Sequence, residues 1–529
     1  MPSQHPPHTT APKTLWSYAF FNLTLLVLLA AWLWYRNQPV TMPEPQLPAD
    51  KKLQCVSYSP YYGKKQTPFL KNYKVPKAQI DRDMELLSQR FECVRIYSVG
   101  QGLDYVPEAA SKVGLKVYLG AWIGWVKADN DKEFNLAIKL ANQYPDVVKA
   151  VIIGNEVLLR REQTPAVIQS YLERAQSATQ VPVTYADVWE FWLKNKSLEK
   201  SVDFVTIHIL PYWEDDPQPI ENAVSHTSNV MQRLSTVFSK PLLIGETGWP
   251  SMGRQRGPSI PSQLNQASYM RQFIGEAHAK NWNYNLIEAM DQPWKRVLEG
   301  TMGGYWGLYG TDLKPKFDWN GPLSERNDDC TPLYWAIGGV LIWAGLALYR
   351  RERRASAWLA MSLLGVTAGI SGMLQIAYLE TAARDVMEWL ALGSIVVVGW
   401  AALIAITWLY TSPISGKADR IMRLCLGFLL AGAAIAGWLL MTDGRYRDFP
   451  LVLYALPVLQ LSIGMSLAGR DTRTAWRPFY VINGIAVVSV IACIVLEPIN
   501  LSAWLWAALT VLLTFASWPK HSAGAYEKT

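Results

Sequence analysis

The sequence predicts an α/β barrel of eight strands combined with a set of apolar, membrane-spanning helices. Half of the 529 residues are hydrophobic and only 18% are charged, whereas an ordinary soluble domain has roughly 25% charged residues. The mean hydropathy is nevertheless close to zero, at +0.04, so a polar part and an apolar part are averaged. The long apolar runs lie near the N-terminus and beyond residue 330, and short strand-like and helix-like segments alternate between them.

The first apolar run, 15–35, has no charged residue and lies between Lys13 and Arg36. A run of this length spans a bilayer, and a cleaved signal usually has a shorter apolar core of roughly 7–15 residues. We therefore expect an uncleaved anchor helix after a cytoplasmic tail, 1–14, with a cleaved signal peptide as the alternative. The Pro-rich segment that follows predicts a linker over 36–52.

Eight short apolar segments alternate with helix-like segments over 53–326. This number and rhythm are typical of a (β/α)8 TIM barrel. The alternative is an open, doubly wound sheet, but the segment 57–63 lacks the Gly-rich phosphate loop that usually follows the first strand of that fold. The predicted strands are 53–59, 92–98, 115–121, 149–154, 181–186, 203–209, 241–246 and 284–290.

Beyond residue 330 the sequence predicts a transmembrane domain of seven helices, 331–518, and then a tail, 519–529. With the first helix this makes eight spans, each long enough to cross the apolar core of a bilayer. The apolar runs are 333–349, 355–379, 389–411, 424–441, 451–468, 478–496 and 501–518.

The basic residues indicate the orientation of these spans. If the N-terminus is cytoplasmic, the loops 350–354, 412–423 and 469–477 and the C-terminal tail are cytoplasmic too, and they hold twelve Lys and Arg against three in the opposite loops. The positive-inside rule therefore places both termini inside and the barrel outside, which in a bacterium means the inner membrane and the periplasm. Topology thus explains the net charge of +7, and no basic patch with interleaved aromatics indicates nucleic acid.

Two carboxylates are expected at the C-terminal ends of opposing strands. Glu156 follows the fourth strand, after Gly154 and Asn155, and Glu246 ends the seventh. Active sites of such barrels lie at this end, and strands four and seven face each other, so both side chains can point into one site. Two carboxylates beside a sugar are the minimum apparatus for glycoside cleavage. The alternative for each is a helix-capping or turn residue.

The residues around both glutamates resemble glycoside hydrolase family 17, the β-1,3-glucanase family of retaining (β/α)8 enzymes. The segment 240–253, KPLLIGETGWPSMG, follows the family's signature around its nucleophile, and 151–157, VIIGNEV, follows its fourth-strand motif. Shorter matches lie at 94–97, 117–120 and 307–309, so the resemblance covers about half of the chain. Bacterial relatives of this layout are described as β-1,6-glucan synthases or endo-β-1,3-glucanases.

The resemblance implies that Glu156 is the general acid/base and Glu246 the nucleophile of a double displacement through a covalent glycosyl-enzyme. Such enzymes hold the two carboxyl groups about 5–5.5 Å apart, and the acid needs a pKa above that of the nucleophile. It also implies that Asn155 holds the sugar 2-hydroxyl and that Tyr212 hydrogen-bonds the nucleophile. Arg95 would keep Glu246 ionised, since a nearby cation lowers the pKa of a carboxyl group.

Aromatic side chains at the predicted strand ends suit a sugar site, because flat rings stack on the apolar faces of glucose. About half of eight Trp residues there are expected to touch sugar. The substrate-binding candidates are Trp122, Trp189, Trp213, Trp249 and Trp294, and Trp125, Trp192 and Trp306 complete the set. Tyr58, Arg95, Tyr97, Asn155, Tyr212, Asp291 and Lys295 are the other candidates.

The sequence departs from the family at two places. The segment 290–295 reads MDQPWK where plant members have Phe-Asp-Glu-Asn-x-Lys, and His208 stands where the family often has Asn. These positions shape the acceptor side, so they put hydrolysis of long β-1,3-glucan in doubt and leave the catalytic pair in place.

No cofactor and no metal are predicted, because the six His residues are scattered and no metal-ligand spacing occurs. The lack of a Gly-rich phosphate loop likewise argues against a nucleotide sugar. Cys55 and Cys93 occupy similar places in the first two strands. Two buried free thiols are the favoured interpretation of this pair, and a disulfide in an oxidising compartment is the alternative.

The functional hypothesis is a membrane-bound retaining enzyme that cleaves β-1,3-glucan and transfers the glycosyl unit to a sugar acceptor, with β-1,6 branching, or to water. The alternatives are a strict endo-β-1,3-glucanase and a non-catalytic glucan-binding or export subunit. The helical half has three interpretations: an anchor and scaffold, a guide for glucan or dock for a synthase or export partner, and an independent transporter. The last is disfavoured, because the ionisable residues Glu380, Asp385, Glu388 and Glu497 lie at predicted span ends.

Overall fold

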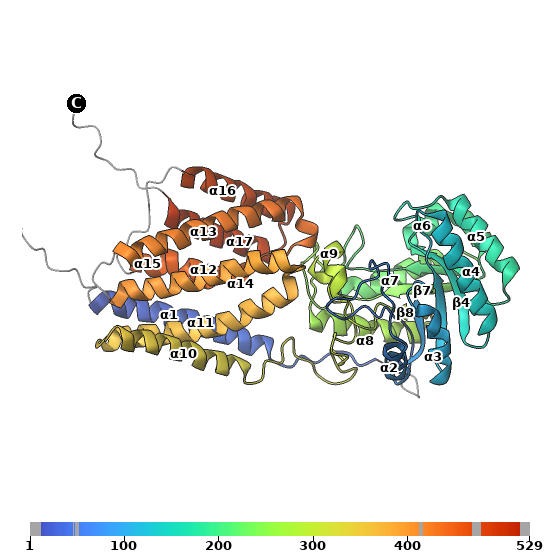
Figure 1. Cartoon of the computed structure of the whole chain (residues 1–529), viewed down its shortest axis with the longest axis horizontal. Coiled ribbons are helices and arrows are strands. Elements are labelled where there is room, and N and C mark those ends of the chain that lie inside the picture. The colour runs from blue at the N-terminus through green and yellow to red at the C-terminus, as the bar shows by residue number, and fades with distance from the viewer. Residues whose placement is uncertain (1–11, 46, 48–51, 412–415, 468–477, 519–529) are drawn as a thin grey trace, which may run out of the picture. The chain divides into compact units, whose positions relative to one another are not determined.

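The computed structural model describes residues 12–45, 47, 52–411, 416–467 and 478–518. Within them the chain forms two compact units, a barrel unit over Val40–Leu323 and a helical unit made of the residues up to Pro39 and from Ser324 onward (Figure 1). The predicted C-terminal tail, the loop 469–477 and most of the N-terminal tail lie outside the described residues, as do parts of the predicted linker.

Eight parallel strands close the barrel in chain order, β1 to β8. The prediction of a (β/α)8 barrel is therefore confirmed. Val40 also pairs with Leu323, so the barrel unit begins before the predicted boundary at residue 53. The strands are β1 (Leu53–Ser57), β2 (Phe91–Ile96), β3 (Lys116–Ala121), β4 (Val148–Asn155), β5 (Val183–Val188), β6 (Val205–His208), β7 (Leu242–Thr247) and β8 (Asn283–Leu286).

Helices follow the strands, and two of them, α5 and α8, begin at a side-chain cap. Thr164 accepts a hydrogen bond from Val167 N–H at the start of α5, and Ser262 accepts one from Asn265 N–H at the start of α8. The barrel helices are α2 (Lys77–Ser88), α3 (Val106–Lys112), α4 (Lys127–Gln143), α5 (Pro165–Ala178), α6 (Trp189–Lys194), α7 (Ile220–Ser235), α8 (Gln263–Ala279) and α9 (Arg296–Glu299).

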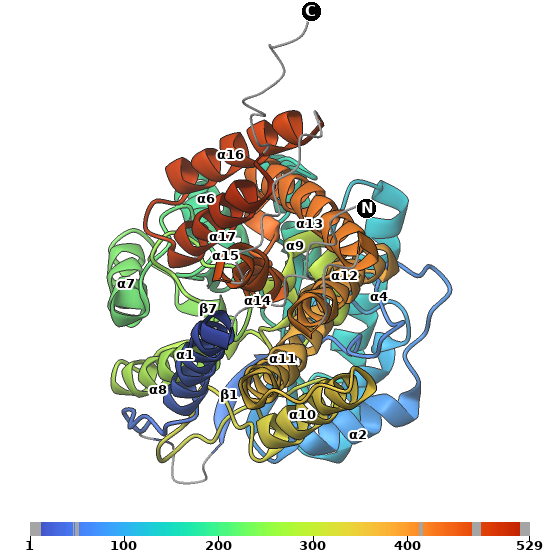
Figure 2. The ribbon, with the colours of Figure 1, turned by 90° about the vertical axis from the view of Figure 1, so that its left-hand side faces the viewer.

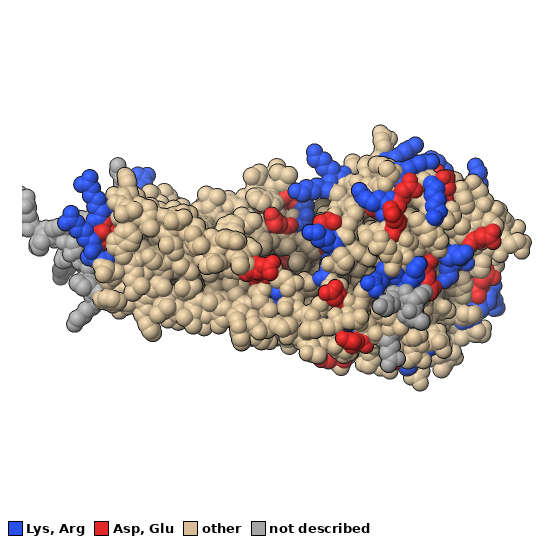
Figure 3. All heavy atoms as spheres, turned by 90° about the horizontal axis from the view of Figure 1, so that it is seen from below, with Lys and Arg blue, Asp and Glu red and all other residues tan. Residues whose placement is uncertain are grey.

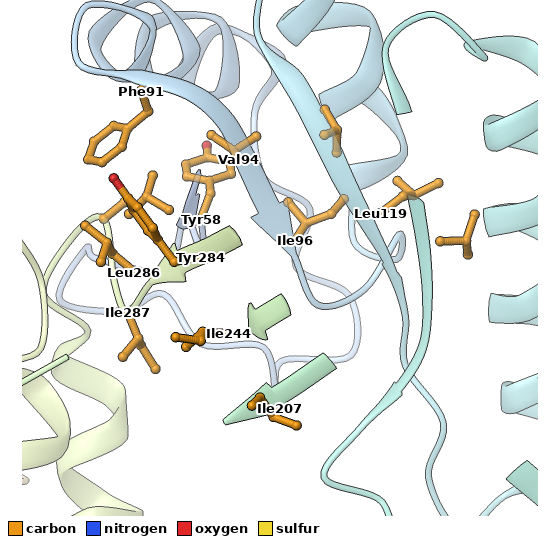
Figure 4. Packing of buried hydrophobic residues seen from close by; sticks show 14 of the residues in the cluster. Tyr58, Phe91, Val94, Ile96, Leu119, Ile207, Ile244, Tyr284, Leu286 and Ile287 are labelled. Carbon is orange, nitrogen blue, oxygen red and sulfur yellow. The ribbon is translucent and has the colours of Figure 1, made fainter. Parts of the chain in front are cut away.

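Strand alternation decides which residues face the helices and which face the barrel interior. Val94 and Ile96 of β2 are fully buried in the main apolar cluster, together with residues of the helices (Figure 4). Because successive side chains point to opposite faces of a strand, Arg95 between them points into the barrel. A fixed cation is thus placed inside the barrel by the apolar residues on either side of it.

Cys55 and Cys93 form a disulfide inside the barrel. The preference for free thiols is wrong, because the parallel register of β1 and β2 places these two residues directly opposite each other, with Cα atoms 4.5 Å apart. That separation lies within the range that a disulfide spans.

The helical unit contains the predicted apolar helices (Figures 1 and 2). Within the described residues, five helices are long and apolar enough to cross a membrane, and three apolar helical segments (451–467, 480–496 and 501–517) are shorter. The helices are α1 (Pro12–Arg36), α10 (Thr331–Tyr349), α11 (Ala355–Ala382), α12 (Val386–Thr411), α13 (Gly416–Thr442), α14 (Leu451–Leu459), α15 (Met465–Leu467), α16 (Pro478–Leu496) and α17 (Leu501–Ser517), with a π-helical turn at Gln460–Gly464.

The first helix is packed into this unit through buried polar side chains. Tyr18 of α1 donates a hydrogen bond of 2.7 Å to Gln460 Oε1, and Gln460 Nε2 donates one of 2.8 Å to Asn22 Oδ1. The Tyr18 ring stacks on Tyr410 of α12 with centroids 4.0 Å apart. On the face shown in Figure 3, charged side chains of the helical unit gather towards its ends and an uncharged band lies between them.

Candidate active site

Glu156 and Glu246 meet at the C-terminal mouth of the barrel, as the strand order requires. Glu156 directly follows β4, and Glu246 is the residue before the last of β7. One oxygen of each carboxylate and one ring nitrogen of His208 all lie within 4.8 Å of one another. This separation fits a retaining pair, about 5–5.5 Å apart, and not an inverting pair, about 6.5–9.5 Å apart.

The backbone before the acid/base candidate adopts an unusual conformation. Gly154 has φ 83° and Glu156 has φ 52°, a region that side-chain-bearing residues rarely adopt. A Cβ atom at Gly154 would lie 2.8 Å from Val157 Cγ2, so only glycine fits there. Strained backbone of this kind costs of order 1–3 kcal/mol and is concentrated at functional sites. The turn aims the Glu156 carboxylate at the barrel mouth, where its side chain is 22% exposed.

Arg95 of β2 holds the residues on both sides of the site. Its Nη1 donates to the carbonyl of Gly245 at 2.6 Å and to Glu246 Oε1 at 3.3 Å, and its Nη2 donates to Asn155 Oδ1. A Cβ atom at Gly245 would lie only 3.3 Å from Arg95 Nη1 and 2.5 Å from Thr206 Cγ2, so glycine permits this close approach. The guanidinium, 1% exposed, therefore fixes the predicted nucleophile and the predicted sugar-binding amide in one frame.

Tyr97 is the phenol that contacts Glu246. Its hydroxyl lies 2.9 Å from Glu246 Oε1 and 2.8 Å from Ser57 Oγ. A phenol has one hydrogen, so it donates to the carboxylate and accepts from Ser57. Burial, and then the charge of Glu246, raise the pKa of Tyr97 well above its ordinary value, which keeps the hydroxyl protonated as a donor.

His208 was not among the predicted site residues, and it joins the two carboxylates. It is fully buried at the end of β6, with Nδ1 2.9 Å from Glu156 Oε1 and Nε2 3.4 Å from Arg95 Nη1. Arginine can only donate, so Nε2 accepts and the proton is assigned to Nδ1, which donates to Glu156. The only sequence signal was the difference from the family's usual Asn.

The protein environment shifts the pKa of Glu156 downwards. Burial raises it, but the hydrogen bond and charge of His208 outweigh burial, with help from Arg160 and Arg95. Arg160 Nη1 lies 3.8 Å from Glu156 Oε2. This direction is opposite to the one that the acid step needs.

The three side chains Glu156, His208 and Glu246 have the composition of a metal site, but Arg95 opposes a cation there. Its Nη1 lies within 3.4 Å of His208 Nε2 and 3.3 Å of Glu246 Oε1. A metal ion at these ligands would meet a buried positive charge, so we assign the cluster to acid–base and nucleophilic chemistry.

The predicted aromatic platforms divide by burial. Trp122 and Trp125 are exposed, at 39% and 69%, and Trp189, Trp213 and Trp294 are half-buried. The prediction for Trp249 is wrong, because it is fully buried and its indole N–H donates to the carbonyl of Ile260 at 3.0 Å. Packing likewise encloses Trp192 and Trp306.

Three further predicted roles are corrected by the geometry. The single phenolic hydrogen of Tyr212 goes to the carbonyl of Arg254, at 2.6 Å, so Tyr97 takes the predicted place of Tyr212 beside the nucleophile. Tyr58 is 1% exposed and donates to Asp83 of α2, so it cannot touch a substrate. Asp291 is 5% exposed and is enclosed by Lys316, 2.6 Å away, which leaves almost none of its carboxylate for a sugar.

Lys295 forms a buried ion pair that the sequence did not reveal. Its Nζ lies 2.8 Å from Glu288 Oε1 and 3.0 Å from Glu288 Oε2. Burial lowers the pKa of Lys295, but the charges of Glu288 and Glu299 outweigh it and the pKa is raised. Lys295 is therefore a fixed cation beside the mouth, and the charge of Glu246 acts on it as well.

Comparison with known proteins agrees with this geometry. Residues 55–307 match the family model described as "BtgE/BtgC glycoside hydrolase domain". The chain is 28% identical over 239 residues to a probable beta-glucosidase btgE of Aspergillus flavus, covering 44% of this chain and 39% of the relative. It is 25% identical over 271 residues to a glucan 1,3-beta-glucosidase of Arthroderma benhamiae, covering 48% of this chain and 87% of the relative.

The chain thus spans about 39% of the length of the btgE relatives that it matches. Among solved structures, it resembles an active-site mutant of Rhizomucor miehei beta-1,3-glucanosyltransferase in complex with laminaritriose, with TM-score 0.45 and 24% identity over 51% of this chain and 98% of that one. The family match, the closed barrel and the paired glutamates at its mouth agree. The barrel of this chain is similar to the BtgE/BtgC glycoside hydrolase domain over residues 55–307.

Proposed function

We propose that this protein is a membrane-bound retaining enzyme that cleaves β-1,3-glucan and transfers the glycosyl unit to a sugar acceptor or to water. The observation that carries the proposal is the spacing of Glu156 and Glu246, within 4.8 Å at the ends of opposing strands. Its relatives bear the names beta-glucosidase, glucan 1,3-beta-glucosidase and beta-1,3-glucanosyltransferase, which supports a β-1,3-linked glucan as the donor.

The first half of the reaction forms a covalent intermediate. A Glu246 oxygen attacks the anomeric carbon, the glycosidic C–O bond breaks, and Glu156 gives its proton to the departing oxygen. Glu246 is held for this attack by Arg95 and by Tyr97. His208 donates to Glu156 Oε1, so the proton that leaves is carried by Oε2, the oxygen that Arg160 faces.

The second half returns the enzyme to its starting state. Glu156, now a carboxylate, takes the proton of an acceptor hydroxyl as that oxygen attacks the anomeric carbon and releases Glu246. The downward pKa shift of Glu156 suits a group that must spend this step ionised. The same shift leaves less of the acid form for the first step, so we infer that substrate binding expels water from Glu156 and raises its pKa at that stage.

The helical unit supports a location in a membrane. Five of its helices are long and apolar enough to cross a bilayer, and the arginines of the described loop 350–354 would lie on the cytoplasmic side under the positive-inside rule. The disulfide Cys55–Cys93 supports an oxidising compartment for the barrel, since disulfides persist there. We therefore place the barrel on the outer face and both termini in the cytoplasm.

Incubation of the purified full chain with laminari-oligosaccharides tests the activity. Products longer than the donor, resolved by mass and by linkage, would show transfer, and a new β-1,6 linkage would show branching. Only shorter products would favour the strict endo-β-1,3-glucanase. Glu246→Ala should abolish either reaction; unchanged oligosaccharides with the unmodified chain would sink the proposal of an enzyme.

A thiol-labelling experiment tests the orientation. Cys330 is exposed and directly precedes α10. In the sequence it lies between the barrel unit and that helix. A membrane-impermeant maleimide added to intact spheroplasts should label the protein, and Cys330→Ser should abolish the label. Labelling only after the cells are broken would place the barrel in the cytoplasm and overturn the topology.

A further inference from the structure

A hollow of about 500 Å³ lies on the loops that follow β3, β4 and β5. Its wall begins at Leu158, two residues after Glu156, and continues with Gln163 on the same loop, Trp125 after β3, and Phe191 and Asn195 around α6. The volume is within the range of roughly 300–1,000 Å³ that is usual for small-molecule sites. The catalytic steps described above use none of these side chains.

The lining of this hollow suits an uncharged polyhydroxy ligand. Trp125 is 69% exposed, and a large ring left in water on a polar barrel offers a flat face for the apolar side of a sugar. Amide groups of Gln163 and Asn195 and the ammonium group of Lys194 stand around it. Lys194 and Arg161 are balanced in part by Glu162, so the hollow is not a site for a highly charged ligand.

Side-chain contacts connect the hollow to the acid/base. Arg160 lies 3.8 Å from Glu156 Oε2 and 2.9 Å from Glu162 Oε2, and Glu162 lines the hollow. The Arg160 guanidinium also stacks over the exposed ring of Trp122, 4.5 Å from its centroid. Gln163 Nε2 donates 2.7 Å to the carbonyl of Gly124, which ties the loop after β4 to the loop after β3.

The reaction geometry decides which part of a glucan would lie there. The anomeric carbon must lie next to Glu246 on β7, and the departing oxygen must lie next to Glu156 after β4. The sugar that leaves, or the acceptor that replaces it, therefore extends away from Glu246 over the loops on the Glu156 side. Those are the loops that build the hollow.

We propose that this hollow is an outer acceptor subsite, which binds a β-glucan chain beyond the sugar that receives the transferred unit. This inference rests on the proposed function and adds to it a specific place and ligand. An acceptor held at two points stays longer beside the glycosyl-enzyme and competes better with water, so occupation of the hollow favours transfer over hydrolysis.

Binding is measured with the full chain carrying Glu246→Gln, which removes turnover, and with the same chain carrying Trp125→Ala as well. Laminari-oligosaccharides of increasing length are the probes. We expect Kd for the longer chains to rise about tenfold on loss of Trp125, which corresponds to roughly 1.4 kcal/mol, and Kd for laminaribiose to change far less. Leu159→Ala is the matched control, because Leu159 is 40% exposed on the loop after β4 and does not line the hollow.

The active chain gives a second readout. Trp125→Ala should lower the ratio of transfer products to hydrolysis products, and Leu159→Ala should leave that ratio unchanged. The subsite would be overturned if the Trp125→Ala and Leu159→Ala variants bound oligosaccharides of every length with equal Kd. The proposed function would still stand if Glu246→Ala abolished activity in the same experiments. Failure of the Glu246→Gln chain to bind any oligosaccharide, with no turnover by the unmodified chain, would overturn both.

Discussion

His208 Nδ1 lies 2.9 Å from Glu156 Oε1. The opposite ring nitrogen lies 3.4 Å from Arg95 Nη1 and 3.7 Å from Glu246 Oε1. The charged groups that face this ring come from four strands or strand ends: Arg95, Glu156, Asp187 and Glu246. One buried imidazole therefore links the acid/base to the groups that hold the nucleophile.

Replacement of His208 by Ala or Leu, which cannot donate a hydrogen bond, should change the pH profile as well as the rate. The His208 hydrogen bond lowers the pKa of Glu156, so its loss leaves burial to raise that pKa, and the high-pH limb of kcat/KM should move to higher pH. Glu156 also loses the contact that positions its carboxyl group, so natural glucans should react about 10–100-fold more slowly even at the new pH optimum, within the range of general acid catalysis. An aryl glucoside with a good leaving group should lose much less, because its departure needs no proton.

His226→Leu is the matched control for that experiment. His226 lies on α7 and contacts a different carboxylate, with Nε2 2.8 Å from Glu214 Oε2. The limb should stay in place in this variant. A His208 variant with an unmoved limb and an equal loss on every leaving group would contradict the role of the imidazole in acid/base catalysis.

Tyr97→Phe should weaken attack by the nucleophile. The change removes the hydrogen bond of 2.9 Å to Glu246 Oε1, and hydrogen bonds to charged groups contribute roughly 1.5–3 kcal/mol, so kcat/KM should fall about 10–100-fold. Unlike the His208 variants, this one should lose rate on good and poor leaving groups alike. Tyr105→Phe, which removes a hydroxyl bonded to Asp81 on α2, should leave kcat/KM unchanged.

Mass measurement checks the disulfide directly. Alkylation of the denatured, unreduced chain should modify Cys330, Cys425 and Cys493 and spare Cys55 and Cys93. Replacement of Cys55 and Cys93 by Ser should destabilise the barrel by roughly 3–4 kcal/mol, because the bond closes a loop with a sequence separation of 38. Addition of five alkyl groups without reductant would disprove the bond.

Glu288 should make the barrel less stable as the pH rises. Burial raises its pKa from 4.5 to about 7, although Lys295 acts against this. The folded barrel thus keeps a proton that the unfolded chain releases, and this contribution is lost as the pH climbs from about 4.5 through 7. Glu288→Gln should flatten the dependence of Tm on pH between 5 and 7.

Glu85→Gln on α2 is the control for this titration, because Glu85 is exposed. Its Tm should follow the unmodified chain at every pH. Parallel Tm curves for Glu288→Gln and the unmodified chain would show that Glu288 is ionised throughout that range, contrary to the burial argument.

The sequence predicted the strands, the barrel and the meeting of Glu156 with Glu246, because strand alternation and chain order suffice for these features. It did not separate Tyr97 from Tyr212 as the partner of the nucleophile, since both rings follow strands and only the packed structure shows which hydroxyl is already engaged by Arg254. The prediction that Trp249 binds substrate was wrong for the same reason, because a Trp at a strand end can face either the mouth or the helices.

The register between strands accounts for one further miss, and the irregular chain after β8 accounts for another. Cys55 and Cys93 bond because β1 and β2 pair without an offset at these residues, and no single-strand pattern fixes that offset. The ion pair of Glu288 with Lys295 depends on the fold of the chain after β8, where short helices and turns leave no periodic pattern to interpret.

The docking of α1 has a consequence for the order of synthesis. Tyr18 finds its buried partner Gln460 only 442 residues later in the chain, and the whole barrel is translated between the two. The first helix is therefore made without the contacts of Tyr18 and Asn22 to Gln460, and these contacts form only after the barrel has been translated. Assembly of the helical unit is consequently one of the last events in the biogenesis of this protein, and truncation before Gln460 would leave α1 without its final contacts.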